Sequence, residues 1–249
     1  LEHNGPEFID LMARVMTATF IEHASLKLDP PFTITLGVLS RALDREHASR
    51  LAADLRMRRP EGARPMIAQP GTTHVSVVDA EGTLISFTHS IGSLAGSGVV
   101  TPGLGILFNN FLGHFSPLPG VPDSIVRGKR GGGGCAAIVF DGTRPYIVIG
   151  APGGSRLITA IFQSILNTVD RRMTMAEAVS TPRFHSEEPA LLFAEPSIPE
   201  GVVEAVRARG YRVERSTYMS RVQAILIAQD GGFHPGPDPR GGAAALADA

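Results

Sequence analysis

Residues 72–79 read TTHVSVVD and residues 83–88 read TLISFT, with the turn AEG between them. In the first segment polar and apolar side chains alternate with a period of two, which is the period of a β-strand. Because a short turn containing a glycine joins the two segments, the pattern predicts a β-hairpin. Upstream, residues 59–71 contain prolines and glycines without periodicity, which predicts an exposed, flexible connection ending at Gly71.

The rest of the chain alternates between helical and strand patterns. Apolar residues recur at three- and four-residue steps between residues 6 and 59, which predicts two amphipathic helices, the second over 36–55. Residues 136–140 and 146–149 flank an Asp-Gly turn and are nearly all apolar, which predicts a second hairpin in a sheet covered on both faces. Residues 155–170 have a broad apolar face and predict the clearest helix. Further helices near 174–179 and 199–209, with strands near 211–213 and 222–227, indicate an α+β fold.

Composition excludes several classes of partner. The chain has 249 residues, 43% of them hydrophobic, which is enough to bury a sizeable core. Its 23 basic and 24 acidic residues give a net charge of −1, so no bulk field attracts nucleic acid or a membrane surface, and we expect neither partner. The chain begins with neither a signal peptide nor an initiator methionine, so we expect it to be part of a longer product. Its localisation stays open.

Metal and cofactor chemistry has no support in the sequence. Cys135 is the single cysteine, so no disulfide framework or multi-cysteine metal site can form. The eight histidines include no pair at a metal-ligand spacing such as His-x-x-x-His. We therefore expect no metal and no cofactor, and we expect isolated histidines such as His74 to be structural residues held by hydrogen bonds.

The junction between Gly71 and Thr72 is the first candidate for chemistry. A threonine hydroxyl is a poor nucleophile, but cleavage of the preceding peptide bond would place an α-amine, with a pKa of about 7.7–8.0, beside it as a base. Taken alone, the Gly-Thr-Thr sequence is common and favours an ordinary strand start. Residues 151–156, APGGSR, add a second signal, because the amides of Gly153 and Gly154 at a helix N-terminus are suited to binding an oxyanion.

Four blocks in this order resemble the γ-glutamyltranspeptidase family. The blocks are TTHVSVVD at 72–79, GSGVV at 96–100 with GILFNN at 105–110, APGGSR at 151–156, and TPRFH at 181–185. The resemblance covers residues 72–249, while residues 1–71 resemble the end of that family's large subunit. It implies an N-terminal nucleophile hydrolase with a four-layer αββα sandwich, in which residues 72–249 form one domain with the upstream part. It also implies a precursor that cleaves itself before Thr72.

The resemblance carries an activity and several site residues with it. It implies attack on the carbonyl of a small-molecule γ-glutamyl amide, an acyl-enzyme, and release of the acyl group to water or to an acceptor amine. Thr72 matches the nucleophile, and Gly153 with Gly154 matches the oxyanion hole. Ser90 stands where the family usually has a threonine that hydrogen-bonds the nucleophile, and serine keeps that donor and acceptor. The implied partner is the missing large-subunit region, in a heterodimer or an (αβ)2 assembly.

The positions that read the glutamyl head depart from the family pattern. Gly92 replaces an asparagine, and Phe111 and His114 replace an acidic or amide residue and an aspartate that together grip the α-ammonium. Gly133 and Gly134 replace two serines that bind the α-carboxylate. A buried ammonium without its aspartate typically costs about 3–5 kcal/mol, so a normal γ-glutamyl substrate should bind badly. His114 could instead prefer an anion.

Three hypotheses follow. The first is an amidohydrolase or acyltransferase of this family, self-cleaved before Thr72, with altered acyl-group specificity. The second is an ordinary γ-glutamyl hydrolase or transpeptidase acting on glutathione-type substrates through a rearranged site. The third is a catalytically silent family member that serves as a structural or binding protein. Cleavage at Thr72 and turnover of γ-glutamyl amides are the observations that separate them.

Overall fold

The computed structural model describes residues 1–25, 40, 43–57, 71–120, 124–128, 134–241 and 244–246. The chain forms two compact units, each assembled from separate stretches of sequence. The first comprises residues 1–66, 111–132 and 184–217, and the second comprises residues 67–110, 133–183 and 218–249. The predicted connection over 59–71, except Gly71, and part of the predicted helix over 36–55 lie outside the described residues. The predicted division of the chain into residues 1–71 and 72–249 refers to self-cleavage before Thr72, and it stays a prediction.

The first unit combines helices with a small sheet. Its helices are α1 (Pro6–Ser25), α3 (Arg45–Met57), α6 (Glu200–Ala208) and the short 3-10 helix η1 (Phe111–His114). Its strands are β5 (Phe184–His185), β6 (Leu191–Ala194) and β7 (Arg212–Arg215), with β6 antiparallel to β5 and parallel to β7. Helix α3 starts after Asp44 because the Asp44 carboxylate accepts a hydrogen bond from the backbone N–H of His47.

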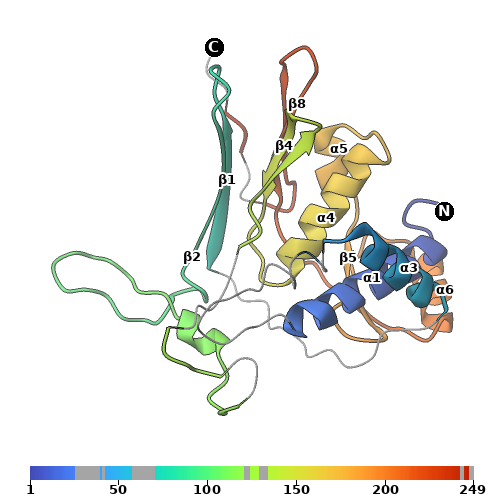
Figure 1. Ribbon diagram of the computed structural model, residues 1–249, viewed down its shortest axis with the longest axis horizontal. Coiled ribbons are helices and arrows are strands. Elements are labelled where there is room, and N and C mark those ends of the chain that lie inside the picture. The colour runs from blue at the N-terminus through green and yellow to red at the C-terminus, as the bar shows by residue number, and fades with distance from the viewer. Residues whose placement is uncertain are drawn as a thin grey trace. The chain divides into compact units, whose positions relative to one another are not determined.

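The second unit contains both predicted hairpins. Strands β1 (Thr72–Val78) and β2 (Leu84–Ser90) pair antiparallel, as predicted. A four-stranded antiparallel sheet has the order β3 (Ala137–Asp141), β4 (Arg144–Gly150), β8 (Gln223–Ile227) and β9 (Phe233–Pro237). The β1–β2 hairpin covers one side of this sheet, while α4 (Arg156–Val169) and α5 (Met175–Ser180) cover the other (Figure 1). The unit is therefore layered as hairpin, sheet and helices.

Strand β4 is the centre of this unit. Ile147, Val148 and Ile149 are completely buried, so the prediction of a strand covered on both faces is confirmed for β4. Ile147 and Ile149 pack in one core cluster with Leu157 and Ile161 of α4. The same prediction is wrong for the end of β3, where Phe140 is 53% exposed because β3 is the edge strand of the sheet.

Helix α4 has its predicted position, but its buried face is partly polar. The predicted apolar face includes Ile158 and Phe162, which are 38% and 39% exposed. Gln163 and Ser164 are buried instead, and their side chains donate to backbone carbonyls one turn earlier in the helix. Because the helix itself satisfies these polar groups, their burial leaves no donor unpaired.

Strand β9 and the short strands β5 and β6 were not predicted from the sequence. Strand β9 contains Pro235 and Pro237, and proline normally argues against a strand because it lacks an N–H group. The structure accommodates both prolines because β9 lies at the edge of its sheet and, among the described strands, pairs with β8 alone. Within the described ranges, no helix combines the length and the hydropathy that crossing a bilayer requires.

Candidate active site

Thr72 and Ser90 are brought together by the register of the first hairpin. Thr72 is the first residue of β1, Ser90 is the last residue of β2, and the two are paired across the ladder. Their side-chain oxygens, Thr72 Oγ1 and Ser90 Oγ, are 2.8 Å apart. Either hydroxyl can donate in this hydrogen bond, so Ser90 can accept the proton of Thr72.

The carbonyl group before Thr72 is held in place. The Gly71 carbonyl oxygen accepts a hydrogen bond of 3.0 Å from the backbone N–H of Ile91, and Ser90 Oγ lies 3.5 Å from it. Gly71 has φ +140°, and a Cβ built on it would lie 2.5 Å from the Gly92 carbonyl oxygen and nearer still to that of Ser93. Only glycine fits this position, because both the backbone conformation and the space exclude a side chain.

The glycine pair stands directly before helix α4. Gly153 and Gly154 have φ of +139° and +62°, and both precede the first residue of α4. Pro152 lines a cavity of about 260 Å³ that Thr72 also lines. Pro152, the residue before the glycine pair, therefore lies at one cavity with Thr72, and the oxyanion role of Gly153 and Gly154 stays a prediction.

Arg221 and Gln223 also line this cavity, and sequence reasoning did not find either of them. Arg221 is half-buried, and no acidic side chain among the described residues forms an ion pair with it. A guanidinium in this position attracts anionic groups into the cavity. In the part of the chain that the structure describes, no group of three or more His, Cys, Asp or Glu residues could hold a metal ion.

His74 is a structural residue on the same face of β1 as Thr72. Its ring is buried between hydroxyl groups, with Nδ1 2.8 Å from Thr88 Oγ1 and Nε2 3.1 Å from Ser76 Oγ. Gly150 of β4 makes room for the ring, because a Cβ there would overlap the imidazole atoms. Burial lowers the pKa of His74 to about 4, so the ring is neutral at physiological pH. The prediction of a hydrogen-bonded structural histidine is confirmed.

Two of the predicted substrate-binding glycines lie near this hairpin. The Gly92 backbone N–H donates to Ser90 Oγ over 3.1 Å, which places Gly92 beside the hydroxyl pair. Gly134 lies against Thr88 of β2, since a Cβ built on Gly134 would be 3.0 Å from Thr88 Cβ. Gly133 lies outside the described residues.

The other two predicted substrate-binding residues belong to the first unit. Phe111 and His114 are the two ends of η1, and their rings meet edge to face with centroids 5.3 Å apart. His114 is exposed. The roles of all the predicted substrate-binding residues stay predictions.

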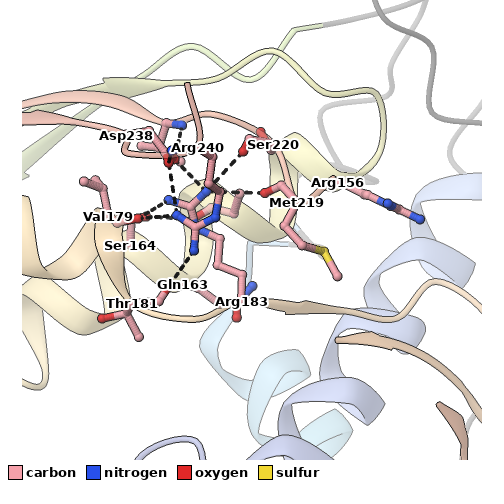
Figure 2. A network of polar contacts seen from close by, with 12 residues as sticks. Arg156, Gln163, Ser164, Val179, Thr181, Arg183, Met219, Ser220, Asp238 and Arg240 are labelled. Atoms are coloured by element: carbon pink, nitrogen blue, oxygen red, sulfur yellow. Dashed lines mark hydrogen bonds and ion pairs between the residues drawn. The ribbon is translucent and has the colours of Figure 1, made fainter. Parts of the chain in front are cut away.

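A buried charged network in the second unit was also missed (Figure 2). The Arg183 guanidinium lies 2.8 Å from Asp238 Oδ2, and both side chains are almost fully buried. Arg240 donates to Asp238 Oδ1 over 3.0 Å, and both arginines donate to the carbonyl oxygen of Val179 near the end of α5. Arg183 is 55 residues from Asp238 in sequence, so no local pattern predicts that these two charges meet.

Comparison with known proteins gives a consistent result. A family model described as Gamma-glutamyltranspeptidase matches residues 1–247. The "Acylase ACY 1 proenzyme" of Pseudomonas sp. (strain V22) is 34% identical over 244 residues, which cover 93% of this chain and 42% of that protein. The "Glutathione hydrolase proenzyme" of Escherichia coli (strain K12) is 35% identical over 184 residues, which cover 68% of this chain and 31% of that protein. The chain thus spans less than half the length of these curated relatives.

A solved structure supports the same assignment. The gamma-glutamyltranspeptidase from Pseudomonas nitroreducens complexed with L-DON is 30% identical, with a TM-score of 0.65 over 71% of this chain and 100% of that chain. This likeness confirms the predicted α+β fold, the αββα sandwich of the N-terminal nucleophile hydrolases.

Proposed function

Because the chain belongs to the gamma-glutamyltranspeptidase family, whose members are hydrolases and transferases of the N-terminal nucleophile type, we propose that it contains the nucleophile of a self-processing amidohydrolase. Its substrate is an amide whose acyl part is not a standard γ-glutamyl group. The observation that carries this proposal is the contact of 2.8 Å between Thr72 Oγ1 and Ser90 Oγ, directly beside the carbonyl group of Gly71.

Processing starts at the bond between Gly71 and Thr72. Thr72 Oγ1 attacks the Gly71 carbonyl carbon, and Ser90 Oγ relays the Thr72 hydroxyl proton to the Thr72 nitrogen while giving up its own proton. The hydrogen bond from the Ile91 N–H polarises the carbonyl. The carbon–nitrogen bond then breaks as the Thr72 nitrogen takes up this relayed proton, which leaves an ester between the two residues. Water hydrolyses this ester, so Gly71 gains a free carboxylate and Thr72 gains a free α-amine.

Turnover uses the same hydroxyl with its new base. The Thr72 α-amine takes the proton of Oγ1, which attacks the carbonyl carbon of the substrate amide. The backbone N–H groups of Gly153 and Gly154 stabilise the oxyanion of the tetrahedral intermediate. The leaving amine departs with a proton, and the acyl group remains on Thr72 as an ester. Water, or an acceptor amine, then attacks the ester and restores the hydroxyl.

The cavity favours an acyl group with a carboxylate and without an ammonium. The positions that grip the α-ammonium in the family are Phe111 and His114 in this chain, and neither side chain provides a negative charge. Arg221, in contrast, provides a positive charge at the cavity that Thr72 lines. Removing the α-ammonium from a γ-glutamyl group leaves a glutaryl group, which keeps one carboxylate. The acylase name of a relative at 34% identity agrees with a substrate outside the γ-glutamyl class.

The chain is proposed to work with a large-subunit region. The curated relatives are proenzymes, and this chain covers 42% and 31% of the two described above. After cleavage before Thr72, the upstream part and the part from Thr72 onward would form a heterodimer or an (αβ)2 assembly.

The first test follows cleavage in the full-length protein by intact mass and by N-terminal sequencing of the smaller fragment. We expect a fragment that starts at Thr72 in the wild-type protein and no fragment in Thr72→Ala. The processed protein is then given the p-nitroanilides of glutarate, of L-glutamate through its γ-carboxyl group, and of butyrate, and release of p-nitroaniline is recorded. Turnover of the glutaryl compound above the other two supports the proposal.

The other outcomes decide for the other hypotheses. Preferred turnover of the γ-glutamyl compound identifies an ordinary γ-glutamyl hydrolase or transpeptidase. An uncleaved wild-type protein leaves Thr72 without its α-amine and identifies a catalytically silent member. As a specificity control, Arg221→Leu should lower kcat/KM for the glutaryl compound and leave that for the butyryl compound unchanged.

A further inference from the structure

Ser220 has an unusual backbone and a completely buried side chain. It lies three residues before β8, is 2% exposed, and has φ +70°, a conformation that residues other than glycine rarely adopt. Its hydroxyl donates a hydrogen bond of 2.5 Å to the carbonyl oxygen of Pro152. Glycine would suit this φ better, so the serine side chain is retained at a conformational cost.

The carbonyl group that Ser220 holds belongs to the peptide that also provides the Gly153 N–H. In a planar trans peptide the C=O and the following N–H point in opposite directions, so fixing one fixes the other. Ser220 also touches Gly153, since a Cβ built there would be 2.9 Å from both Cβ and Oγ of Ser220. Glycine can adopt many backbone conformations, and the φ of +139° at Gly153 is one of several open to it. A contact from another residue is therefore needed to hold Gly153 in this conformation.

The segment around Ser220 is itself anchored at several points (Figure 2). Arg183 donates to the carbonyl oxygens of Met219 and Ser220, over 3.3 and 3.5 Å. The Val222 N–H donates to Asp238 Oδ2 over 2.7 Å, and Asp238 is paired with Arg183. These contacts give Ser220 a fixed support.

We propose that Ser220 is a positioning residue of the oxyanion hole, which orients the Gly153 N–H through the Pro152 carbonyl group. This inference rests on the proposed function, in which Gly153 N–H binds the oxyanion. Removing an oxyanion-hole donor typically lowers kcat by about 100- to 1000-fold, and a donor that is present but poorly oriented should cost less, about 10- to 100-fold.

The test compares Ser220→Ala and Ser220→Gly with Ser164→Ala in the processed full-length protein. Both Ser220 variants lack the hydroxyl, and glycine relieves the φ of +70° and therefore protects folding. Ser164 is the matched control, because it is also buried and its Oγ also donates to a backbone carbonyl, that of Ala160, in the middle of α4. Two quantities are measured: kcat and KM for the p-nitroanilide that the wild-type protein cleaves fastest, and hydrogen exchange of the segment 151–156 by mass spectrometry.

We expect both Ser220 variants to lower kcat by about 10- to 100-fold with KM within about twofold of wild type, and to speed exchange in 151–156. Ser164→Ala should change neither quantity. Wild-type kcat and unchanged exchange in the Ser220 variants would overturn the inference, as would equal losses in Ser164→Ala. Failure of the proposed function is seen separately, since the wild-type protein itself would then cleave none of the p-nitroanilides.

Discussion

Ser90 Oγ lies 2.8 Å from Thr72 Oγ1, and the two residues are partners at the open end of the β1–β2 hairpin. This contact predicts that Ser90→Ala slows both self-cleavage and turnover by about 100-fold. Self-cleavage loses the hydroxyl that relays the Thr72 proton, and turnover loses the hydrogen bond that orients Thr72 Oγ1. Ser90→Thr keeps a hydroxyl and should stay close to wild type. Ser86→Ala on the same strand removes a hydroxyl that donates to the Ile149 carbonyl and serves as the control. The rates are measured by intact mass over time and by p-nitroaniline release, and equal rates in Ser90→Ala and Ser86→Ala would contradict the prediction.

Gly71→Ala should leave the protein uncleaved or slow its cleavage by at least about tenfold. The added Cβ would collide with the carbonyl oxygens of Gly92 and Ser93 and would shift the Gly71 carbonyl away from Thr72 Oγ1. Gly82→Ala is the matched control, because Gly82 also has positive φ but open space around it. Precursor and product are separated by mass after expression. Cleavage of Gly71→Ala at the rate of Gly82→Ala would show that the carbonyl is not held as described.

Asp238→Asn should lower the free energy of unfolding by about 3–5 kcal/mol, because Arg183 and Arg240 would be left without their buried acid. Urea unfolding of the two proteins at the same pH measures the difference. Arg207→Ala is the surface control, since Arg207 is more than a third exposed and its loss should cost about 1 kcal/mol or less. A loss in Asp238→Asn no larger than in Arg207→Ala would contradict the importance of the network.

Stability should fall as the pH is lowered from about 6.5 toward 4 because of His74. Burial lowers the pKa of His74 to about 4 in the folded protein, whereas in the unfolded chain the ring titrates near 6.5. Between these pH values the unfolded state binds one more proton than the folded state, so the free energy of unfolding rises with pH. On acidification it decreases by up to roughly 3 kcal/mol.

Urea unfolding at pH 7.5 and pH 5 measures this loss, and His74→Gln should reduce the difference between the two pH values. His89→Gln is the control, because His89 is exposed on the neighbouring strand β2. If His74→Gln keeps the wild-type pH dependence, other groups are responsible for it.

Local patterns in the sequence predicted most of the second unit. The alternation over 72–78 and the turn at Gly82 predicted the first hairpin, and the spacing of apolar residues after Ser155 predicted α4. Strand β9 was missed because Pro235 and Pro237 argue against a strand unless its edge position is known. The family could also be predicted, because each of its motifs is contiguous in sequence. The match of the family model confirms this prediction.

The candidate site was predicted in part. Thr72 could be proposed as the nucleophile from its hydroxyl group and its place at the start of a strand. Gly153 and Gly154 could be proposed as the oxyanion hole from their place before a helix. Ser220 and Arg221 carried no local signal, and their places near Pro152 and in the Thr72 cavity depend on how β8 packs beside the end of β4.

The sequence by itself therefore determined the hairpins, the main helices, the family and the identity of the candidate nucleophile, because each depends on residues that are close along the chain. Only the tertiary structure decided which distant groups meet. Ser220 reaches Pro152 across 68 residues, and Asp238 pairs with Arg183 across 55, because the sheet brings β4, β8 and β9 side by side. Side-chain periodicity encodes which face of an element is buried, but the partner of a buried polar group depends on the packing of whole elements.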